Sequence, residues 1–209
     1  VGIFIFHIPD KFFYRIFLGH TFGEENVGLY QLVFPVYALG ISFSCAGTEL
    51  ALSRCVAQEN AAGHPEKAKE LLKTGLIFTF VLSCILTIFL QHNAHMTAIS
   101  FLHDSRCEEL LILLSYTFPF ASIHSCICGY SLGLKQTKIP AVSQLFEQTF
   151  RILFVFLFCY YRTSHQLDLS ISFAVVGLAM GEIFASCYCL YSIHHTASKQ
   201  VQNLLSAST

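Results

Sequence analysis

Four polar residues recur at helical spacing within one apolar stretch of the sequence: Gln144, Glu147, Gln148 and Arg151. This spacing places all four on one face of an α-helix whose other faces carry Leu, Phe, Ile and Val. A carboxylate, a guanidinium and two amides in line can form the wall of a polar substrate pathway through a membrane. Alternatively, Glu147 and Arg151 form an internal ion pair, and the glutamines hold neighbouring helices together. We favour the pathway, because an ion pair alone would not need four polar positions in line.

Single ionisable residues in other apolar stretches are further candidates for a buried cavity: Arg15, Glu49, Arg54 and Glu182. Ionisable groups within membrane helices usually face a bundle interior or a water-filled space. Glu49 has the alternative of lying at the headgroup level, where water solvates it, and long basic side chains can extend to the interface. Gly177 and Gly181, just before Glu182, have the spacing of a helix-packing face. We expect the charged candidates and the polar stripe to border one substrate cavity.

Catalytic and metal-binding signatures are missing from the sequence. No HExxH, GxSxG or glycine-rich phosphate loop occurs, and the histidines at 92–103 share a loop without a second cluster. The nine cysteines lie mostly in apolar runs, as small buried hydrophobic residues do. The pairs Cys126/Cys128 and Cys187/Cys189 have one intervening residue, whereas zinc ribbons and thioredoxin-like motifs use two. We therefore expect no enzymatic activity, no metal site and no cofactor.

The elements that position the polar residues must lie in a membrane, as the composition of the 209-residue chain indicates. Hydrophobic residues make up 54% of the chain and charged residues 12%, about half the charged share of soluble domains. A mean hydropathy of +0.58 leaves too few solvating groups to cover a soluble globule. The net charge of -1 excludes the basic surface with which nucleic-acid-binding proteins neutralise phosphates. The composition therefore predicts an integral membrane protein with no nucleic-acid partner.

Apolar runs close to the roughly 20 residues that cross a bilayer as a helix recur along the chain. They predict an all-α bundle of six transmembrane helices over residues 1–195, with spans at 2–18, 27–56, 71–90, 110–134, 139–161 and 169–193. The first span is short and looks clipped at its start, and Pro35 should kink the second. Residues 196–209 form a tail with soluble character. Transmembrane strands are not expected, since these runs are continuously apolar.

The distribution of lysine and arginine predicts the orientation, because cytoplasmic loops are enriched in both. Seven basic residues flank the connections at 57–70 and 135–138 or lie in the tail: Arg54, Lys67, Lys69, Lys73, Lys135, Lys138 and Lys199. The opposite side holds two, Arg106 and Arg162. We therefore expect these connections and both termini to lie in the cytoplasm.

Two stretches, residues 12–63 and 129–158, carry a family resemblance. Their specific elements are Gly28-Leu29-Tyr30-Gln31, Phe34-Pro35, the Ala46-Gly47 to Ser53-Arg54 segment, and Gly129-Tyr130 through Gly133-Leu134 to Ser143-Gln144 and Glu147-Gln148. In this order and combination the sequence resembles the multidrug/oligosaccharidyl-lipid/polysaccharide flippase superfamily. The resemblance is greatest to the stage V sporulation protein B and Wzx-type polysaccharide exporter branches, and lipid II flippases are more distant.

The resemblance implies a MATE-like fold, in which two six-helix lobes enclose a cavity that opens alternately to each side of the membrane. The chain matches the amino-terminal lobe, so a second lobe is an implied partner and residues 196–209 an implied start of the link to it. The implied cargo is a lipid-linked sugar, and the implied location is the plasma membrane with its lipid. By position, Arg15 matches a basic residue of the family's first helix, and Glu147 matches the acidic residue of its Ser-Gln-x-x-Glu-Gln motif. Thr48-Glu49 departs from the usual apolar residue followed by proline, which predicts a different cavity shape here.

Three functional hypotheses follow. The leading one is a flippase that moves lipid-linked oligosaccharide or peptidoglycan and polysaccharide precursors by alternating access. The alternative is a cation-coupled multidrug antiporter of the same superfamily, favoured if Glu49 or Glu147 exchanges a proton or Na⁺ during transport. A third is a truncated lobe without transport of its own.

Overall fold

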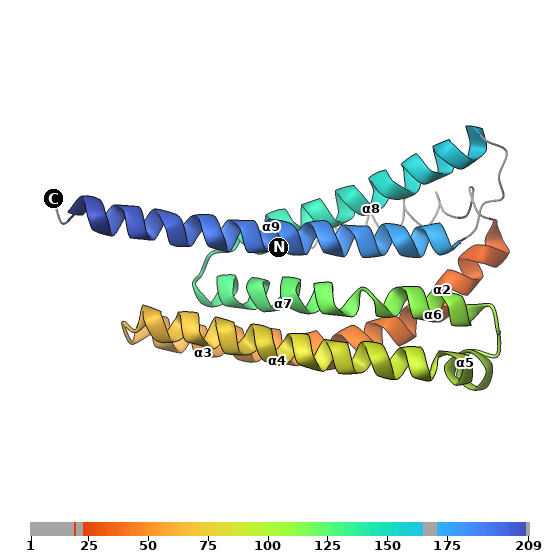
Figure 1. Ribbon diagram of the computed structural model, residues 1–209, viewed down its shortest axis with the longest axis horizontal. Helices are drawn as coiled ribbons and strands as arrows, with labels where there is room; N and C mark the ends of the chain where they lie inside the picture. The colour runs from red at the N-terminus through yellow and green to blue at the C-terminus, as the bar shows by residue number, and fades with distance from the viewer. Residues whose placement is uncertain (1–18, 20–22, 165–170, 208–209) are drawn as a thin grey trace.

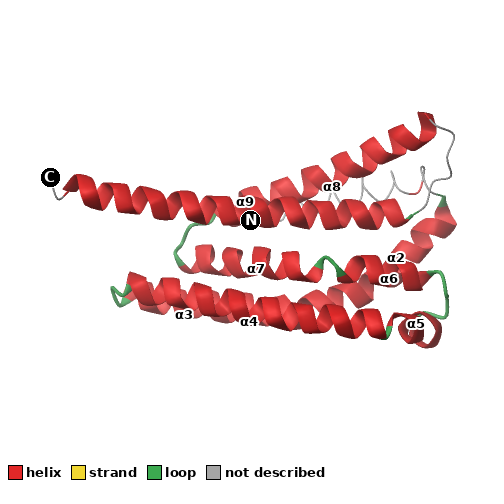
Figure 2. Cartoon of the chain, viewed as in Figure 1, coloured by secondary structure: helices red, strands yellow, loops and turns green. Residues whose placement is uncertain are grey.

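The computed structural model describes residue 19, residues 23–164 and residues 171–207, and all regular secondary structure in this part is helical (Figure 1, Figure 2). The first predicted span, residues 2–18 with Arg15, lies outside the described residues. For the part of the chain that is described, the all-α prediction is confirmed.

The described chain consists of long helices joined by short connections. α2 (Glu24–Ile41), the π-helical turn η1 (Ser42–Ala46) and α3 (Gly47–Ala61) follow one another directly, and α4 covers Pro65–His92. The short elements α5 (Ala94–Met96) and η2 (Thr97–Phe101) lead to α6 (Cys107–Ser115) and α7 (Phe118–Gly133). α8 covers Lys138–Ser164, and α9 covers Ser172–Ala207, which extends helix into the predicted tail.

Among the described residues, four helical stretches are long and apolar enough to cross a membrane: Glu25–Ala61, Pro65–His92, Lys138–Tyr161 and Ser172–His195. α6 and α7 form a fifth if this pair, bent by 44°, is one broken span. Large apolar side chains such as Ile77, Ile85 and Ile88 of α4 are exposed, as lipid-facing residues are. These stretches coincide with the second to the sixth predicted spans.

The fourth predicted span is interrupted just before Pro119. The sequence predicts one helix over 110–134 with this proline inside it, whereas α6 ends at Ser115 and α7 begins at Phe118. Proline has no backbone N–H to donate and fits the first turn of a helix, where that N–H would have no intrahelical partner. Pro119 therefore starts a new helix. Pro35, by contrast, lies inside α2, which is inclined to α3 in Figure 1.

The long helices pack as two groups that α7 connects (Figure 1). α8 pairs with α9, while α3, α4 and α7 pack on one another, and α7 also contacts α9. Glycines permit close approach: a Cβ at Gly133 would lie 2.8 Å from the Ser53 carbonyl oxygen of α3, and one at Gly181 would lie 2.7 Å from the Glu147 carbonyl oxygen of α8. The packing face predicted at Gly177 and Gly181 is confirmed.

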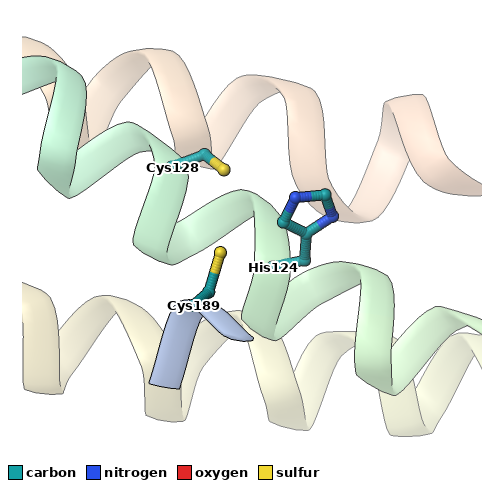
Figure 3. Close-up of side chains that lie close together, drawn as sticks. All are labelled: His124, Cys128 and Cys189. Atoms are coloured by element: carbon teal, nitrogen blue, oxygen red, sulfur yellow. The ribbon is translucent and has the colours of Figure 1, made fainter. Parts of the chain in front are cut away.

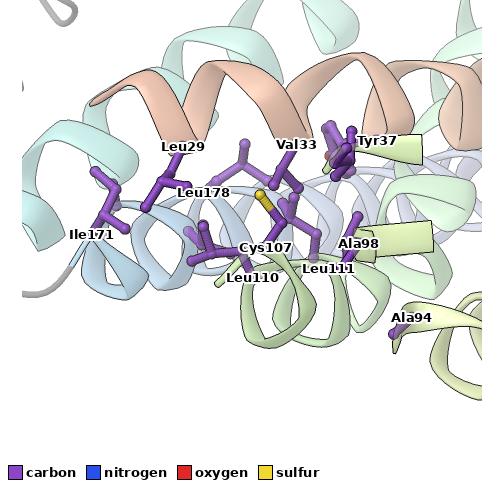
Figure 4. Packing of buried hydrophobic residues seen from close by; sticks show 14 of the residues in the cluster. Leu29, Val33, Tyr37, Ala94, Ala98, Cys107, Leu110, Leu111, Ile171 and Leu178 are labelled. Carbon is purple, nitrogen blue, oxygen red and sulfur yellow. The ribbon is translucent and has the colours of Figure 1, made fainter. Parts of the chain in front are cut away.

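An apolar core fixes α2 against the rest of the bundle (Figure 4). Leu29, Val33 and Tyr37 of α2 belong to one buried cluster with Leu111 of α6 and Leu178 of α9. The Tyr37 ring also stacks on Phe118 at the start of α7, with the ring centroids 5.8 Å apart. This core positions the end of α2, from which η1 and α3 continue toward the polar part of the bundle.

Candidate functional site

A cavity of about 380 Å³ lies where η1 and α3 face α7, α8 and α9. Its polar lining residues are Glu49, His124, Ser125, Thr137, Gln144 and Glu182, and apolar residues and the thiols of Cys45 and Cys128 complete the wall. Three predicted site residues, Glu49, Gln144 and Glu182, thus border one space although they come from three different helices.

His124 of α7 connects the helices on one side of the cavity. Its Nδ1 lies 3.2 Å from Oε2 of Glu182 on α9, and its Nε2 lies 3.0 Å from Oγ of Ser143 on α8. The side chains of His124 and Glu182 are only 12% and 11% exposed. A neutral imidazole satisfies both contacts if it donates from Nδ1 to the carboxylate and accepts the serine hydroxyl at Nε2. The pair can also hold a further proton, which makes the imidazole a cation beside a carboxylate.

Glu49 of α3 reaches the cavity from the opposite side. Ser125 Oγ of α7 donates a hydrogen bond of 2.7 Å to Glu49 Oε2. A Cβ at Gly129 would lie 2.7 Å from the Glu49 carbonyl oxygen, so the absence of a side chain at this glycine lets α3 approach α7. Glu49 is half-buried and lines the cavity.

The predicted polar stripe of α8 divides into two parts. Gln144 lines the cavity, whereas Arg151 Nη2 donates to Glu147 Oε1 in an ion pair along the same helix. The two paired side chains are only 14% and 13% exposed, and Gly181 of α9 packs against this turn of α8. The ion pair that the sequence offered as an alternative is therefore present. Gln148 is half-buried and is not among the residues that line the cavity.

The remaining predicted site residue within the described chain is Arg54, whose side chain is exposed and lies outside the cavity lining. Arg15 belongs to the residues that the structure does not describe. The structure thus brings together Glu49, Gln144 and Glu182, and it places the Glu147–Arg151 pair next to them: a carboxylate oxygen of Glu147 lies within 4.8 Å of ligand atoms of His124 and Glu182.

Sequence reasoning missed His124. The predicted span at 110–134 contains no Asp, Glu, Lys or Arg, and His124 is its single histidine. An ionisable side chain in a membrane helix is itself a signal of a polar interior site, and this rule would have found it. Ser125 and Ser143 gave no comparable signal, since serines are common in membrane helices.

Among the described residues, two sets of side chains in or beside the cavity have ligand atoms that lie within 4.8 Å of one another, as a shared metal ion would need. One consists of His124, Cys128 and Cys189, and the other of His124, Glu147 and Glu182. In chemical terms, carboxylates and imidazole can bind a proton or a cation, and the carboxylates can accept hydrogen bonds from the hydroxyls of a sugar.

Comparison with known proteins gives one family. A model of the polysaccharide biosynthesis protein family matches residues 8–208. The chain is 29% identical to Stage V sporulation protein B of Bacillus subtilis (strain 168) over 174 residues, which cover 83% of this chain and 34% of that protein. It is 21% identical to Sporulation protein YkvU of the same organism over 182 residues, which cover 87% of this chain and 39% of that protein.

A third relative is Lipid II flippase MurJ, also of Bacillus subtilis (strain 168), with 27% identity over 141 residues that cover 64% of this chain and 26% of that protein. The matched parts amount to about a third of the length of these relatives. No solved structure matches the chain significantly. Since the family model extends over nearly the whole sequence, and the described helices are those of a multi-pass membrane protein, the chain belongs to the polysaccharide biosynthesis protein family.

Proposed function

We propose that this chain forms part of a flippase that moves a lipid-linked sugar precursor across the membrane by alternating access. The observation that carries the proposal is a polar cavity between apolar membrane helices in a member of this family. Glu49, Gln144 and Glu182 offer hydrogen-bonding groups that a hydrophilic head group needs once it leaves water. The exposed apolar faces of the same helices suit the lipid tail of such a cargo.

The arrangement of the lobe is part of the proposal. We infer one six-helix lobe of a MATE-like transporter in the plasma membrane, with a second lobe facing the cavity and both termini in the cytoplasm. Support comes from the α3–α4 and α7–α8 turns, which lie at the same end of the bundle in Figure 1. Most basic residues of the connections are near these two turns, whereas Arg106 is near the other end. This asymmetry agrees with a cytoplasmic location of the basic end.

Transport of a fluorescent lipid-linked oligosaccharide in proteoliposomes tests the function. The full-length protein should flip the probe, and Glu49→Gln or Glu182→Gln should slow flipping by at least about tenfold, as expected when a charged hydrogen-bond partner is lost. Glu66→Gln is the matched control, because Glu66 is 82% exposed on α4 and pairs only with nearby Lys69 among the ion pairs of the described residues. Equal rates in all three variants would contradict a cargo role for the cavity carboxylates.

A second candidate is cation-coupled export of a drug, which the buried His124–Glu182 pair favours because it can take up a proton. Dye efflux driven by an imposed proton or Na⁺ gradient, together with no flipping of the lipid-linked probe, would establish this alternative. Flipping of the probe with no dye efflux would exclude it.

A further inference from the structure

A cluster of three soft metal ligands joins α7 to α9 beside the cavity (Figure 3). His124 and Cys128 are four residues apart on α7 and share a helix face, and Cys189 extends toward them from α9. One donor atom from each residue lies within 4.8 Å of the other two. Cys128 is 7% exposed and Cys189 is fully buried, so solvent does not separate the two thiols.

The separations are close to those of a tetrahedral zinc site. Zn–S bonds of about 2.3 Å and Zn–N bonds of about 2.0 Å place neighbouring donor atoms roughly 3.5–3.8 Å apart. The three donor atoms lie within 4.8 Å of one another, so small side-chain movements bring them to ligand distances. The donor set of two thiols and one imidazole is typical of Zn²⁺, whereas Mg²⁺ and Ca²⁺ prefer oxygen ligands.

The surroundings of the cluster hold the imidazole in an orientation suited to metal binding. Glu182 Oε2 lies 3.2 Å from His124 Nδ1, so the carboxylate can accept the Nδ1 proton and leave the lone pair of Nε2 for a ligand bond. Ser143 Oγ lies 3.0 Å from this Nε2 and 3.7 Å from Cys128 Sγ. The hydroxyl thus occupies a position next to two of the three donors, where it can serve as a fourth ligand.

An ion has a path to the cluster, because His124 and Cys128 both line the 380 Å³ cavity. We propose that His124 Nε2, Cys128 Sγ and Cys189 Sγ bind one Zn²⁺ ion, with Ser143 Oγ or a water molecule in the fourth position. Binding releases the two thiol protons, so that two thiolates balance the charge of the ion. The ion then connects α7 to α9 directly. This site does not depend on the cargo or on the direction of transport.

Metal content of the purified protein tests the proposal. Full-length protein in detergent is kept reduced, incubated with Zn²⁺, desalted and analysed by inductively coupled plasma mass spectrometry. We expect about one Zn²⁺ per chain, as for a single tetrahedral site, and a loss of most of it in Cys128→Ser and in Cys189→Ser. The matched controls Cys126→Ser and Cys187→Ser lie two residues away on the same helices and should keep the metal.

Co²⁺ provides a second readout that does not depend on the folding of a variant. Tetrahedral Co²⁺ with thiolate ligands absorbs through sulfur-to-metal charge transfer, and the unmodified protein should show this absorption, which Zn²⁺ should then displace. Absence of the absorption in folded, reduced protein would overturn the proposal whatever the variants do. Equal Zn²⁺ content in Cys128→Ser and Cys126→Ser would also overturn it, as would a Cys128–Cys189 disulfide in protein that was purified under reducing conditions.

Discussion

The buried ion pair of α8 sets the balance of charge beside the cavity. Glu147 and Arg151 are mostly withdrawn from water, so each neutralises the other at a depth where an isolated charge is unfavourable. Arg151→Ala removes the cation that balances Glu147 and should lower the free energy of unfolding by about 3–5 kcal/mol. Arg54→Ala, at an exposed position of α3, should change it by less than about 0.5 kcal/mol. Unfolding in detergent, followed by circular dichroism, measures both.

A double variant separates pairing from transport. Glu147→Gln combined with Arg151→Gln removes both charges, so it should be more stable than Arg151→Ala alone. If Arg151→Ala and the double variant lose the same stability, the pair is not coupled. If folded Glu147→Gln and Arg151→Ala proteins both transport normally, the pair has a structural role and takes no part in cargo binding.

Single residues also show where sequence reasoning stops. Polar spacing along one helix predicted the face that carries Gln144, Glu147 and Arg151, because that information is local. The same local spacing allows the Glu147–Arg151 ion pair, whereas the choice of which residues of this face line the cavity depends on how α7 and α9 pack on α8, which no local pattern encodes. His124 acquires its importance from Glu182 and Ser143, which are distant in sequence.

Between elements, glycine contacts determine the spacing of α3 and α7. A methyl group at Gly133 would lie 2.8 Å from both the Ser53 carbonyl oxygen and the Val56 side chain, whereas one at Gly47 would meet nothing within 4 Å. Gly133→Ala should therefore lower the free energy of unfolding by about 1–3 kcal/mol through overpacking. Gly47→Ala should raise it by about 0.4–1 kcal/mol, because its backbone is helical and alanine restricts the unfolded chain. Thermal unfolding of the two variants measures both changes in stability, and changes of the same sign would contradict this account.

At the opposite end of the bundle, Arg106 joins the loop before α6 to α2. It donates to Asp104 and, with an Nη1–Oε1 distance of 2.7 Å, to Glu25. Hydrogen bonds from Arg106 hold the pKa of Asp104 below its ordinary value of 3.8. A carboxyl whose pKa is lower in the folded state contributes stability above its unfolded pKa and loses it as the pH falls through the folded value.

Asp104→Asn should consequently melt at a slightly lower temperature than the unmodified protein near neutral pH. The effect is small because solvent screens an exposed pair. The difference should shrink as the pH is lowered through and below 3.8, where the unmodified protein also becomes protonated. Melting curves at a series of pH values test this, and a difference that grows toward acid pH would contradict the sign.

The elements follow from the sequence to different degrees. Run length alone located four stretches of the described chain that are long and apolar enough to cross a bilayer, and a fifth if the bent α6–α7 pair is one span, since a helix that crosses a bilayer needs a continuous apolar stretch. The break between α6 and α7 was missed, because a proline can either bend a helix or begin one, and tertiary packing selects between them. The π-helical turn at Ser42–Ala46 contains ordinary helix-compatible residues and has no distinctive sequence signal.

For the whole molecule, the orientation in the membrane is the property with the most direct test. On a background in which the nine native cysteines are replaced, a cysteine at Gln136 in the α7–α8 turn should react with an impermeant maleimide only from the cytoplasm. A cysteine at Ser105, before α6, should react only from the outside. Both positions are exposed, so accessibility depends on the side of the membrane. Labelling of the two positions from the same side would contradict the proposed topology.

The π-helical turn also has a consequence for the phase of the chain around its own axis. Each residue of an α-helix advances by about 100°, and a π-turn accommodates one residue more than the regular winding does. Because η1 takes up this extra residue, α2 and α3 can each take the rotation about the helix axis that its own contacts need. α2 keeps Val33 and Tyr37 in the core, while α3 keeps Glu49 toward Ser125. Deleting Ser42 would remove the extra residue and leave a regular α-helix with both settings kept, whereas deleting Ser42 and Phe43 together would rotate α3 relative to α2 by about 100°, so that both settings could not be met together. The single deletion of Ser42 is therefore the control; we expect the double deletion alone to abolish the effect of Glu49→Gln on transport. The direction in which this acidic group points is thus determined by the number of residues in the turn, as much as by their identity.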